Sequence, residues 1–343
     1  MCTNSLFIKF ISVLFLVCAI SFFARTFFFA SHSTKEELKP APVTQKHWVG
    51  VWPGPNFIEN PNKSIADFKK LSNSSPAVIS IYQPWASSYN NQRLWQTEWV
   101  DSIENSGSVP MVSWESDNWN TSAANDPKYS LDKIIRGDFD QYISEYAKSV
   151  AAWGHPFLLR FDWEMNGNWY PWSVQNNTNG NTPAKYVLAW KHVHDLFVRQ
   201  SAKNAYWVWC PDASQTGVSY SSIYPGDAYV DYGCLDGYNN SKNFGDFSKI
   251  FGAAYAEITA VTKKPLIIGE VASSEEGGSK SDFINNAYNI EIPQKFPTVQ
   301  GVIWFNENKE SNWTINSSSS SLVAYRSAVQ NIYWNNKLNL SKR

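Results

Sequence analysis

The chain has 343 residues, with 29 lysines and arginines against 30 aspartates and glutamates, and a formal net charge of −1 at pH 7. This length allows one large domain or two ordinary ones. A near-neutral chain without a run of basic residues argues against nucleic acid as a partner. Its 17 tryptophans and 17 tyrosines exceed what a core of this size requires, so we expect some of these rings to form a binding surface.

The first 30 residues differ from the rest of the chain. An apolar run from Phe10 to Phe23 follows Lys9, as in the apolar region of a secretory signal peptide. The run is shorter than the about 20 apolar residues that span a membrane. We therefore interpret residues 1–30 as a signal peptide of a secreted protein, in preference to an uncleaved membrane anchor formed by residues 6–29. Residues 31–45 are polar and are expected to be a linker.

Short apolar stretches alternate with amphipathic ones from residue 47 onward. The apolar stretches predict strands over residues 47–52, 77–85, 109–115, 156–164, 205–210, 233–239, 265–271 and 299–306. The amphipathic stretches predict helices over residues 64–71, 92–105, 139–153, 183–201, 247–262, 280–295 and 321–333. The segment 212–230 is expected to be mostly loop. Strands as apolar as these are typical of a parallel sheet covered by helices.

Eight strands with intervening helices predict an α/β fold, a single (β/α)8 TIM barrel formed by residues 46–343. A doubly wound open sheet is the alternative. The sequence Pro53-Gly54-Pro55 after the first strand is not a glycine-rich phosphate loop, so the barrel is favoured and no cofactor is expected. In such a barrel, the catalytic side chains lie at the carboxyl ends of the strands.

Two of the predicted strands run from apolar residues into a glutamate. The first acquires Arg160, Asp162 and Glu164 and then breaks at Asn-Gly into a group of aromatic rings, and the second ends at Glu270. A carboxylate is costly to bury without a partner. Residues so distant in sequence meet only where strand ends converge, and two facing carboxyl groups are the requirement for hydrolysis of a glycosidic bond. Strand alternation further predicts that Arg160 pairs with Asp162.

Arg160–Trp169 (RFDWEMNGNW) resembles the acid/base segment of glycoside hydrolase family 26, whose barrels carry catalytic glutamates on strands four and seven. Gly269-Glu270, Gly237-Tyr238-Asn239 and Val302-Ile303-Trp304-Phe305 follow in the matching order. The resemblance covers nearly the whole mature chain. It implies an endo-β-1,4-mannanase, a β-1,3/1,4-glucanase or a β-1,3-xylanase. Family mannanases usually carry His where this chain has Trp163, which weakens the assignment to mannan but not the reaction class.

The strand ends and the resemblance together assign roles to individual side chains. Glu164 is the expected general acid/base, and Glu270 is the expected nucleophile of a retaining reaction. Arg160 and Asp162 are expected to support the site, and Tyr238 is expected to orient Glu270. The expected contacts to substrate are Trp163, Trp169, Trp172, Tyr238, Trp304 and Glu115, with Trp304 as the floor of the cleavage subsite.

Other kinds of site find little support in the sequence. His192 and His194 are two residues apart on a predicted helix and face different ways, so no metal site is expected. Cys210 and Cys234 could pair in an oxidising compartment, but their positions at the end of one strand and the start of the next make a disulfide the less expected state.

The sequence therefore predicts a secreted, monomeric, retaining endo-β-glycosidase that cuts a β-linked hexose polymer. Mannan is the leading substrate, and mixed-linkage β-glucan is a close second. A non-catalytic barrel that binds carbohydrate is the alternative class of function.

Overall fold

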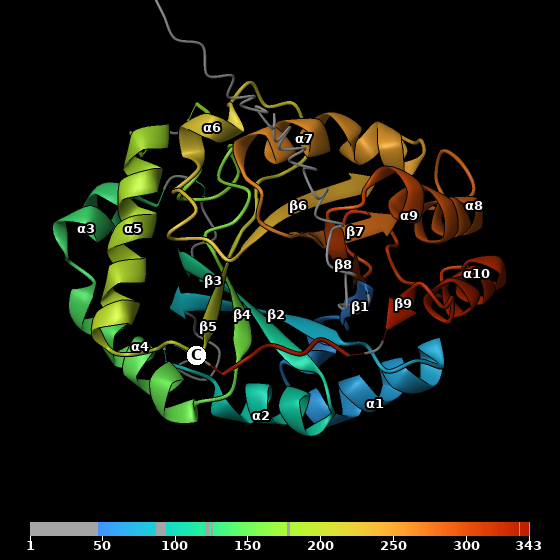
Figure 1. Cartoon of the computed structure of the whole chain (residues 1–343), viewed down its shortest axis with the longest axis horizontal. Coiled ribbons are helices and arrows are strands. Elements are labelled where there is room, and N and C mark those ends of the chain that lie inside the picture. The colour runs from blue at the N-terminus through green and yellow to red at the C-terminus, as the bar shows by residue number, and fades with distance from the viewer. Residues whose placement is uncertain are drawn as a thin grey trace, which may run out of the picture. The chain divides into compact units, whose positions relative to one another are not determined.

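The computed structural model describes residues 47–86, 94–120, 124, 126–176, 179–335 and 337–342. Eight parallel strands form its barrel, with helices around them (Figure 1). The strand β1 (His47–Trp52) pairs with β2 (Val78–Ala86) on one side and with β8 (Val299–Phe305) on the other. These two pairings close the sheet on itself. The predicted (β/α)8 barrel is thus confirmed, and the open sheet is excluded.

The remaining strands pair with their neighbours in chain order. They are β3 (Val109–Asn118), β4 (Phe157–Phe161), β5 (Ala205–Trp209), β6 (Tyr232–Asn239), β7 (Leu266–Ser273) and the short β9 (Trp334–Asn335), which extends the sheet beside β1. The bounds are close to the predicted ones except at the end of β3, which runs three residues further, and at the end of β4, which stops three residues earlier. There Asp162 and Glu164 have φ of 41° and 53°, a left-handed conformation that cannot continue a strand. Glu164 therefore lies in the loop after β4.

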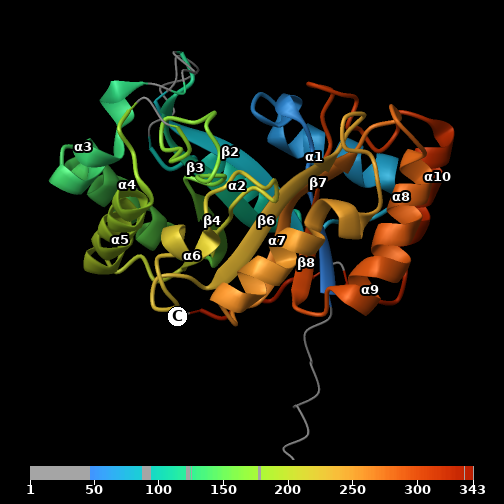
Figure 2. The ribbon, with the colours of Figure 1, turned by 90° about the horizontal axis from the view of Figure 1, so that it is seen from above.

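Helices connect the strands and cover the outside of the barrel (Figure 2). They are α1 (Pro61–Ser72), α2 (Thr97–Asn105), α3 (Leu131–Arg136), α4 (Asp140–Trp153), α5 (Pro183–Arg199), α6 (Tyr220–Ile223), α7 (Phe247–Val261), α8 (Lys280–Asn286), α9 (Ile292–Lys295) and α10 (Ser319–Val329). Two of them were not predicted: α3, and α6 within the expected loop. The predicted helix over residues 280–295 contains a π-helical stretch, Ala287–Glu291. It precedes Pro293, which lacks the amide that a regular helix would use.

Most of the tryptophans are buried in the core and do not form the expected binding surface. Trp48, Trp85, Trp114, Trp190 and Trp209 are among the largest fully buried side chains. Between β3 and α4, for example, the Trp114 ring stacks on Tyr146 with ring centroids 4.2 Å apart. The unusual aromatic content of the chain therefore divides between packing of helices on the barrel and the cleft described below.

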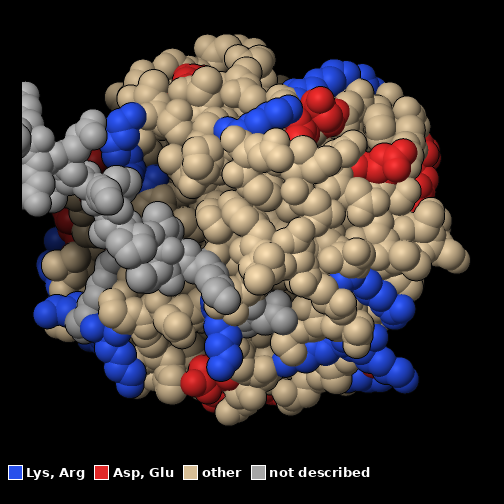
Figure 3. Space-filling model, turned by 45° about the vertical axis from the view of Figure 1, so that its right-hand side comes forward, with Lys and Arg blue, Asp and Glu red and all other residues tan. Residues whose placement is uncertain are grey.

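Residues 1–46 lie outside the described part of the chain, so the signal peptide or anchor and the linker stay predictions. Among the described residues, no helix has both the length and the apolar character needed to cross a membrane. On the face drawn in Figure 3, basic and acidic side chains are scattered over a mainly uncharged surface.

A glycine in β8 tests how closely the barrel is packed. A Cβ at Gly301 would lie 2.1 Å from the ring of Trp48 on the neighbouring strand. We therefore expect Gly301→Ala to lower the free energy of unfolding by about 1–3 kcal/mol, because overpacking displaces the indole. Urea denaturation measures this. Gly252→Ala in α7, where a Cβ meets nothing within 4 Å, is the matched control and should be neutral or stabilising. Equal stability of the two variants would contradict the packing.

Candidate active site

A cleft of about 720 Å³ lies at the carboxyl ends of the strands. Carboxyl groups and aromatic rings dominate its lining, and Lys309 is the one cationic side chain among the described residues that line it. The lining carboxyl groups belong to Glu115, Asp117, Glu164, Asp212, Glu270, Glu307 and Glu310. The aromatic rings are those of Trp52, Tyr82, Trp119, Trp163, Trp169, Tyr170, Tyr238, Phe305 and Trp313.

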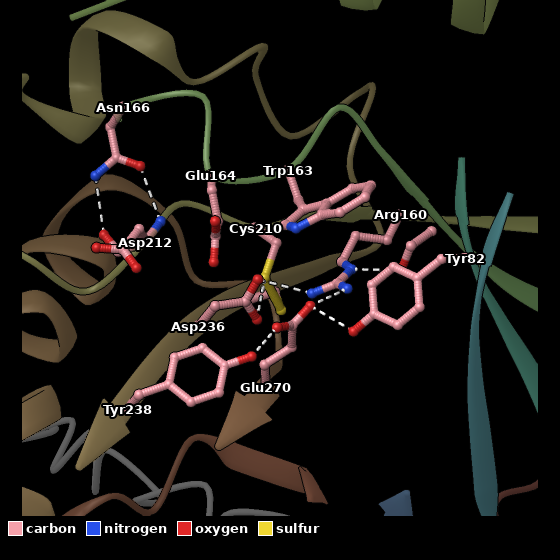
Figure 4. Close-up of polar contacts among 12 residues, drawn as sticks. Tyr82, Arg160, Trp163, Glu164, Asn166, Cys210, Asp212, Asp236, Tyr238 and Glu270 are labelled. Carbon is pink, nitrogen blue, oxygen red and sulfur yellow. Dashed lines mark hydrogen bonds and ion pairs between the residues drawn. A yellow bond between two sulfur atoms is a disulfide. The ribbon is translucent and has the colours of Figure 1, made fainter. Parts of the chain in front are cut away.

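The guanidinium of Arg160 lies fully buried beneath the cleft (Figure 4). Its Nη1 donates to Oδ2 of Asp236 at 2.7 Å, and its Nη2 donates to Oε1 of Glu270 at 2.5 Å. Its Nε donates to Oγ of Ser113 at 2.8 Å. Side chains of β3, β6 and β7 thus meet at one cation from β4. A buried charge needs such partners because its desolvation is costly.

The predicted pairing of Arg160 with Asp162 is wrong. Asp162 accepts hydrogen bonds from the backbone N–H and the hydroxyl of Ser116, both at 2.8 Å. Strand alternation does not extend to Asp162, because its positive φ turns the chain away from the strand direction. Asp162 supports the site by joining the loop after β4 to β3.

Glu270 receives three side-chain donors. Besides Arg160, the Tyr82 hydroxyl donates to Oε1 at 2.7 Å, and the Tyr238 hydroxyl donates to Oε2. Charge-assisted hydrogen bonds of this kind stabilise the ionised carboxylate and fix its orientation. Tyr238 therefore lies where the sequence predicted it. Tyr82, on β2, was missed, because nothing in the sequence around it distinguishes it from other strand residues.

Glu164 has very different surroundings. Its backbone N–H donates to the carbonyl of Cys210 at 2.7 Å, and its Oε2 accepts from the indole N–H of Trp169 at 2.7 Å. Burial and the nearby carboxyl groups of Asp212 and Glu270 hold the pKa of Glu164 well above its usual range, against the lowering effect of the Trp169 hydrogen bond. Glu164 therefore keeps its proton at a pH where carboxyl groups ordinarily lose theirs.

The contacts of Asn166 and Gly167 show why these residues follow Glu164 in the sequence. The Asn166 side chain donates to the carbonyl of Asp212 and accepts from its N–H, at 2.9 Å and 2.8 Å, which fixes Asp212 beside the cleft (Figure 4). A Cβ at Gly167 would lie 2.5 Å from the Trp169 ring. Glycine is therefore needed for that indole to fold back and reach Glu164.

The two glutamates face each other across the base of the cleft. One carboxylate oxygen from each of Glu164, Asp236 and Glu270 lies within 4.8 Å of the others. Such a close approach is compatible with the separation of about 5–5.5 Å between carboxyl groups that direct attack by one carboxylate requires.

Cys210 and Cys234 form a disulfide in the structure (Figure 4), whereas the sequence made free cysteines the more expected state. The register between β5 and β6 places Trp209 beside Gly233. Cys210 and Cys234, the next residue on each strand, therefore also lie beside each other. The sequence does not contain the register between β5 and β6. For this reason a disulfide was the less expected state of the two cysteines.

Two groups of described side chains bring three ligand atoms together: Glu164 with Asp236 and Glu270, and the two cysteines with Asp236. Arg160 donates to two members of the first group. In the second group the sulfur atoms are bonded to each other. Both groups are thus engaged in contacts that compete with a cation.

The predicted aromatic contacts divide between the cleft and the layer behind it. Trp163 and Trp169 line the cleft, whereas Trp172 and Trp304 do not. Trp172 is buried behind Trp163 and donates to its carbonyl at 2.7 Å. Trp304 points outward to pack on α10, where its ring lies 5.7 Å from that of Tyr325.

The next residue on β8, Phe305, faces the cleft in place of Trp304, because successive strand residues point to opposite sides. Trp313 also lines the cleft, and its carbonyl accepts from the Trp304 indole at 2.9 Å. The fully buried Lys280 fixes the same loop by donating to the carbonyls of Asn312 and Thr314. Phe305 and Trp313 therefore lie in the cleft where Trp304 was expected.

Three indole–carboxylate pairs line the cleft. Trp52 donates to Glu307 at 2.8 Å, Trp119 donates to Glu115 at 2.7 Å, and Trp169 donates to Glu164 as described. Each pair fixes an aromatic face beside an oxygen that can contact hydroxyl groups. Glu115 thus lies in the cleft where the sequence predicted it, whereas Trp52, Trp119 and Glu307 were missed because they carry no motif.

Glu115 makes the stability of the protein depend on pH. Burial and then Asp117 raise its pKa to about 8. Because the folded state keeps this proton and the unfolded state loses it near pH 4.5, its contribution to stability falls as the pH rises between these values. Glu115→Gln removes this contribution. We expect the free energy of unfolding of the variant, relative to that of the parent protein, to rise by up to about 4 kcal/mol as the pH increases from 5 to 9. Urea denaturation across this range measures the difference, and a constant difference would contradict the assignment.

Residues 95–329 match the family described as glycosyl hydrolase family 26. Endoglucanase H of Acetivibrio thermocellus is 35% identical over 289 residues, which cover 82% of this chain and 30% of that protein. Mannan endo-1,4-beta-mannosidase of Bacillus subtilis is 31% identical over 186 residues, or 52% of this chain and 46% of that protein. The chain thus spans less than half the length of these relatives.

Solved structures share the fold. The Bacillus subtilis mannanase BCman superposes with a TM-score of 0.61 at 20% identity, covering 85% of this chain and 87% of that one. A β-mannanase from a symbiotic protist of the termite Reticulitermes speratus, complexed with gluco-manno-oligosaccharide, gives a TM-score of 0.60 at 15% identity, covering 85% of this chain and 88% of the other. The resemblance found in the sequence is confirmed: this chain belongs to glycosyl hydrolase family 26.

Proposed function

We propose that this protein is a retaining endo-β-glycosidase in which Glu270 is the nucleophile and Glu164 the general acid/base. The observation that carries the proposal is the opposite environment of two close carboxyl groups. Glu270 accepts from Arg160, Tyr82 and Tyr238, whereas burial and neighbouring carboxyl groups keep the proton on Glu164. An ionised and a protonated carboxyl group on facing sides of one cleft is the arrangement that glycoside hydrolysis uses.

The reaction proceeds in two displacements. Glu270 attacks the anomeric carbon, the bond to the leaving oxygen breaks, and Glu164 gives its proton to that oxygen. The product is a sugar joined to Glu270 by an ester bond. Glu164, now ionised, removes a proton from water, which attacks the same carbon and releases Glu270. Arg160 and the two tyrosines stabilise the carboxylate at the start and at the end of this cycle.

The lining of the cleft supports a neutral polysaccharide as substrate. The aromatic faces can pack against the apolar CH faces of sugar rings, and the carboxyl groups held by indole N–H groups can accept from sugar hydroxyls. Seven carboxyl groups against a single lysine would repel an acidic polymer. A non-catalytic binding barrel would not need a protonated and an ionised carboxyl group at this spacing.

We propose β-glucan as the substrate ahead of β-mannan, which reverses the order that the sequence suggested. Trp163 lines the cleft where family mannanases carry His, and its ring lies 4.8 Å from the Arg160 guanidinium. An indole donates one hydrogen bond and accepts none, so it cannot replace an imidazole toward sugar hydroxyls. The match to an endoglucanase also covers more of this chain than the match to a mannosidase does. Mannan stays the second candidate because of that mannosidase relative.

Removal of either glutamate separates the two roles. We expect Glu270→Ala to lower kcat by about four orders of magnitude on every substrate. Glu164→Ala should lower it about 10²–10⁴-fold on polymers and much less on aryl glycosides, whose good leaving groups need little acid assistance. Reducing-end release and aryl-glycoside hydrolysis measure the two effects. Equal loss on both substrates would contradict the acid role of Glu164, and NMR of the first-formed anomer tests retention.

Trp163 should decide substrate choice. Using mixed-linkage β-glucan, β-mannan and β-1,3-xylan, we expect kcat/KM to be highest on β-glucan in the parent protein. We expect Trp163→His to raise the ratio of mannan to glucan hydrolysis by about tenfold, since one hydrogen bond in a closed site is worth about 1–2 kcal/mol. Trp163→Phe is the control that removes the indole without adding a polar ring. An equal change in both variants would contradict a role for the imidazole.

A further inference from the structure

The disulfide between Cys210 and Cys234 lies directly behind the two proposed catalytic glutamates, and the mechanism above gives it no role. Both cysteines are fully buried. The carbonyl of Cys210 accepts the N–H of Glu164 at 2.7 Å, and the Cys210 Sγ lies 3.2 Å from Oδ1 of Asp236 (Figure 4). Cys210 thus contacts the acid/base residue directly, and it reaches the nucleophile through Asp236 and Arg160.

The strand that carries Glu270 packs against the same sulfur atoms. A Cβ at Gly269 would lie 2.5 Å from the Cys234 Sγ, 2.7 Å from Oδ1 of Asp236 and 3.1 Å from the Cys210 Sγ. No side chain therefore separates the backbone next to Glu270 from the disulfide. The cysteine pair is in contact with the backbone next to both glutamates.

The chemistry of the contact with Asp236 depends on the state of the sulfur. Oδ2 of Asp236 accepts from Arg160 at 2.7 Å, which leaves Oδ1 facing the sulfur. A bridged sulfur has no hydrogen to donate, so the contact is favourable when Oδ1 carries a proton and donates to the sulfur as a weak acceptor. A Cys210 thiol would reverse the direction, with its S–H donating to an ionised Asp236.

The surroundings of Asp236 are compatible with either state. Burial raises its pKa, the Arg160 guanidinium lowers it, and the carboxyl groups of Glu270, Glu164 and Asp212 raise it again, so that it lies well above the usual range. These four charged groups face Asp236 from β4, the loops after β4 and β5, and β7, and among the described residues the titratable Tyr82 on β2 and the two cysteines face it as well. With three neighbouring carboxyl groups and one cation around it, a single added hydrogen-bond donor can decide whether Asp236 is ionised.

We propose that the Cys210–Cys234 pair positions the two catalytic glutamates and, in its bridged form, keeps Asp236 neutral so that the charge of Arg160 serves Glu270 alone. This proposal rests on the glycosidase function proposed above. Reduction by a dithiol breaks the S–S bond, adds one electron and one proton to each sulfur, and converts the dithiol into a disulfide. The Cys210 thiol then donates to Asp236, which loses its proton and shares Arg160 with Glu270.

The state of the cysteine pair should therefore appear in the pH dependence of catalysis. An ionised Asp236 adds a negative charge beside Glu164, which then holds its proton to higher pH. Because the alkaline limb of kcat/KM reports loss of this proton, we expect it to move upward by about one pH unit. The other charged or titratable groups facing the two glutamates are unchanged between the two states: Arg160, Asp212, Tyr82, Tyr170, Tyr238 and Lys309.

Two single variants of the full chain distinguish the effect on the ionisation of Asp236 from a purely structural role of the disulfide. Cys234→Ala leaves the Cys210 thiol beside Asp236, whereas Cys210→Ala removes both the bridge and that sulfur. We expect the upward shift in Cys234→Ala and a smaller one in Cys210→Ala, and we expect Asp236→Asn to abolish the difference. Equal profiles of Cys234→Ala and the parent protein, equal shifts in the two cysteine variants, or two free thiols in the denatured parent protein would each overturn the proposal.

A second measurement does not need activity. The infrared difference between the parent protein and Asp236→Asn at neutral pH should contain the band of a protonated carboxyl group, and this band should weaken in Cys234→Ala. If Cys234→Ala does not fold in a thermal unfolding assay, parent protein reduced with dithiothreitol supplies the thiol state. If the parent protein hydrolyses no polysaccharide, the proposed function fails. The number of free thiols and the infrared band still show whether the disulfide keeps Asp236 neutral. If the band is absent, this part of the proposal is wrong.

Discussion

The buried guanidinium of Arg160 is the interaction on which the site depends. It joins β4 to Ser113 on β3, Asp236 on β6 and Glu270 on β7, so four strands of the barrel are held together by one cation. A buried cation is tolerated only when its partners satisfy it, so Arg160 depends on these three acceptors. The order of the strands around the barrel therefore determines both the pairing and the orientation of Glu270.

Two glutamates of the site have opposite surroundings, Glu270 among hydrogen-bond donors and Glu164 among carboxyl groups. Glu270 is contacted by a cation and two phenol hydroxyls, which donate to its oxygens and fix its orientation. Glu164 has an indole donor and two carboxyl neighbours, which together with burial favour the acid. The left-handed backbone at Asp162 and Glu164 is a local strain in the loop that carries Glu164 away from the strand direction. Chemistry thus follows from differences in environment within a few ångströms.

The aromatic residues show how one composition supports both stability and binding. Rings that point outward from the strands fill the layer between barrel and helices, as Trp304 does against α10. Rings that face the other way line the cleft, where indole N–H groups hold carboxylates in place. A cleft built in this manner presents rigid faces and fixed acceptors before a substrate arrives, which reduces the ordering that binding requires.

The sequence alone determined the barrel, the positions of the two glutamates and the family, because alternating apolar strands and amphipathic helices are local patterns and the segment around Glu164 is contiguous. Only the tertiary structure decided what each side chain contacts. Asp236 and Tyr82 were not recognised, Arg160 was assigned the wrong partner, Trp304 the wrong side of its strand, and the cysteine pair too little weight. In each case the deciding quantity is the register between strands or the backbone direction at a strand end. Both arise from packing between segments that are distant in sequence, and a local pattern does not contain them.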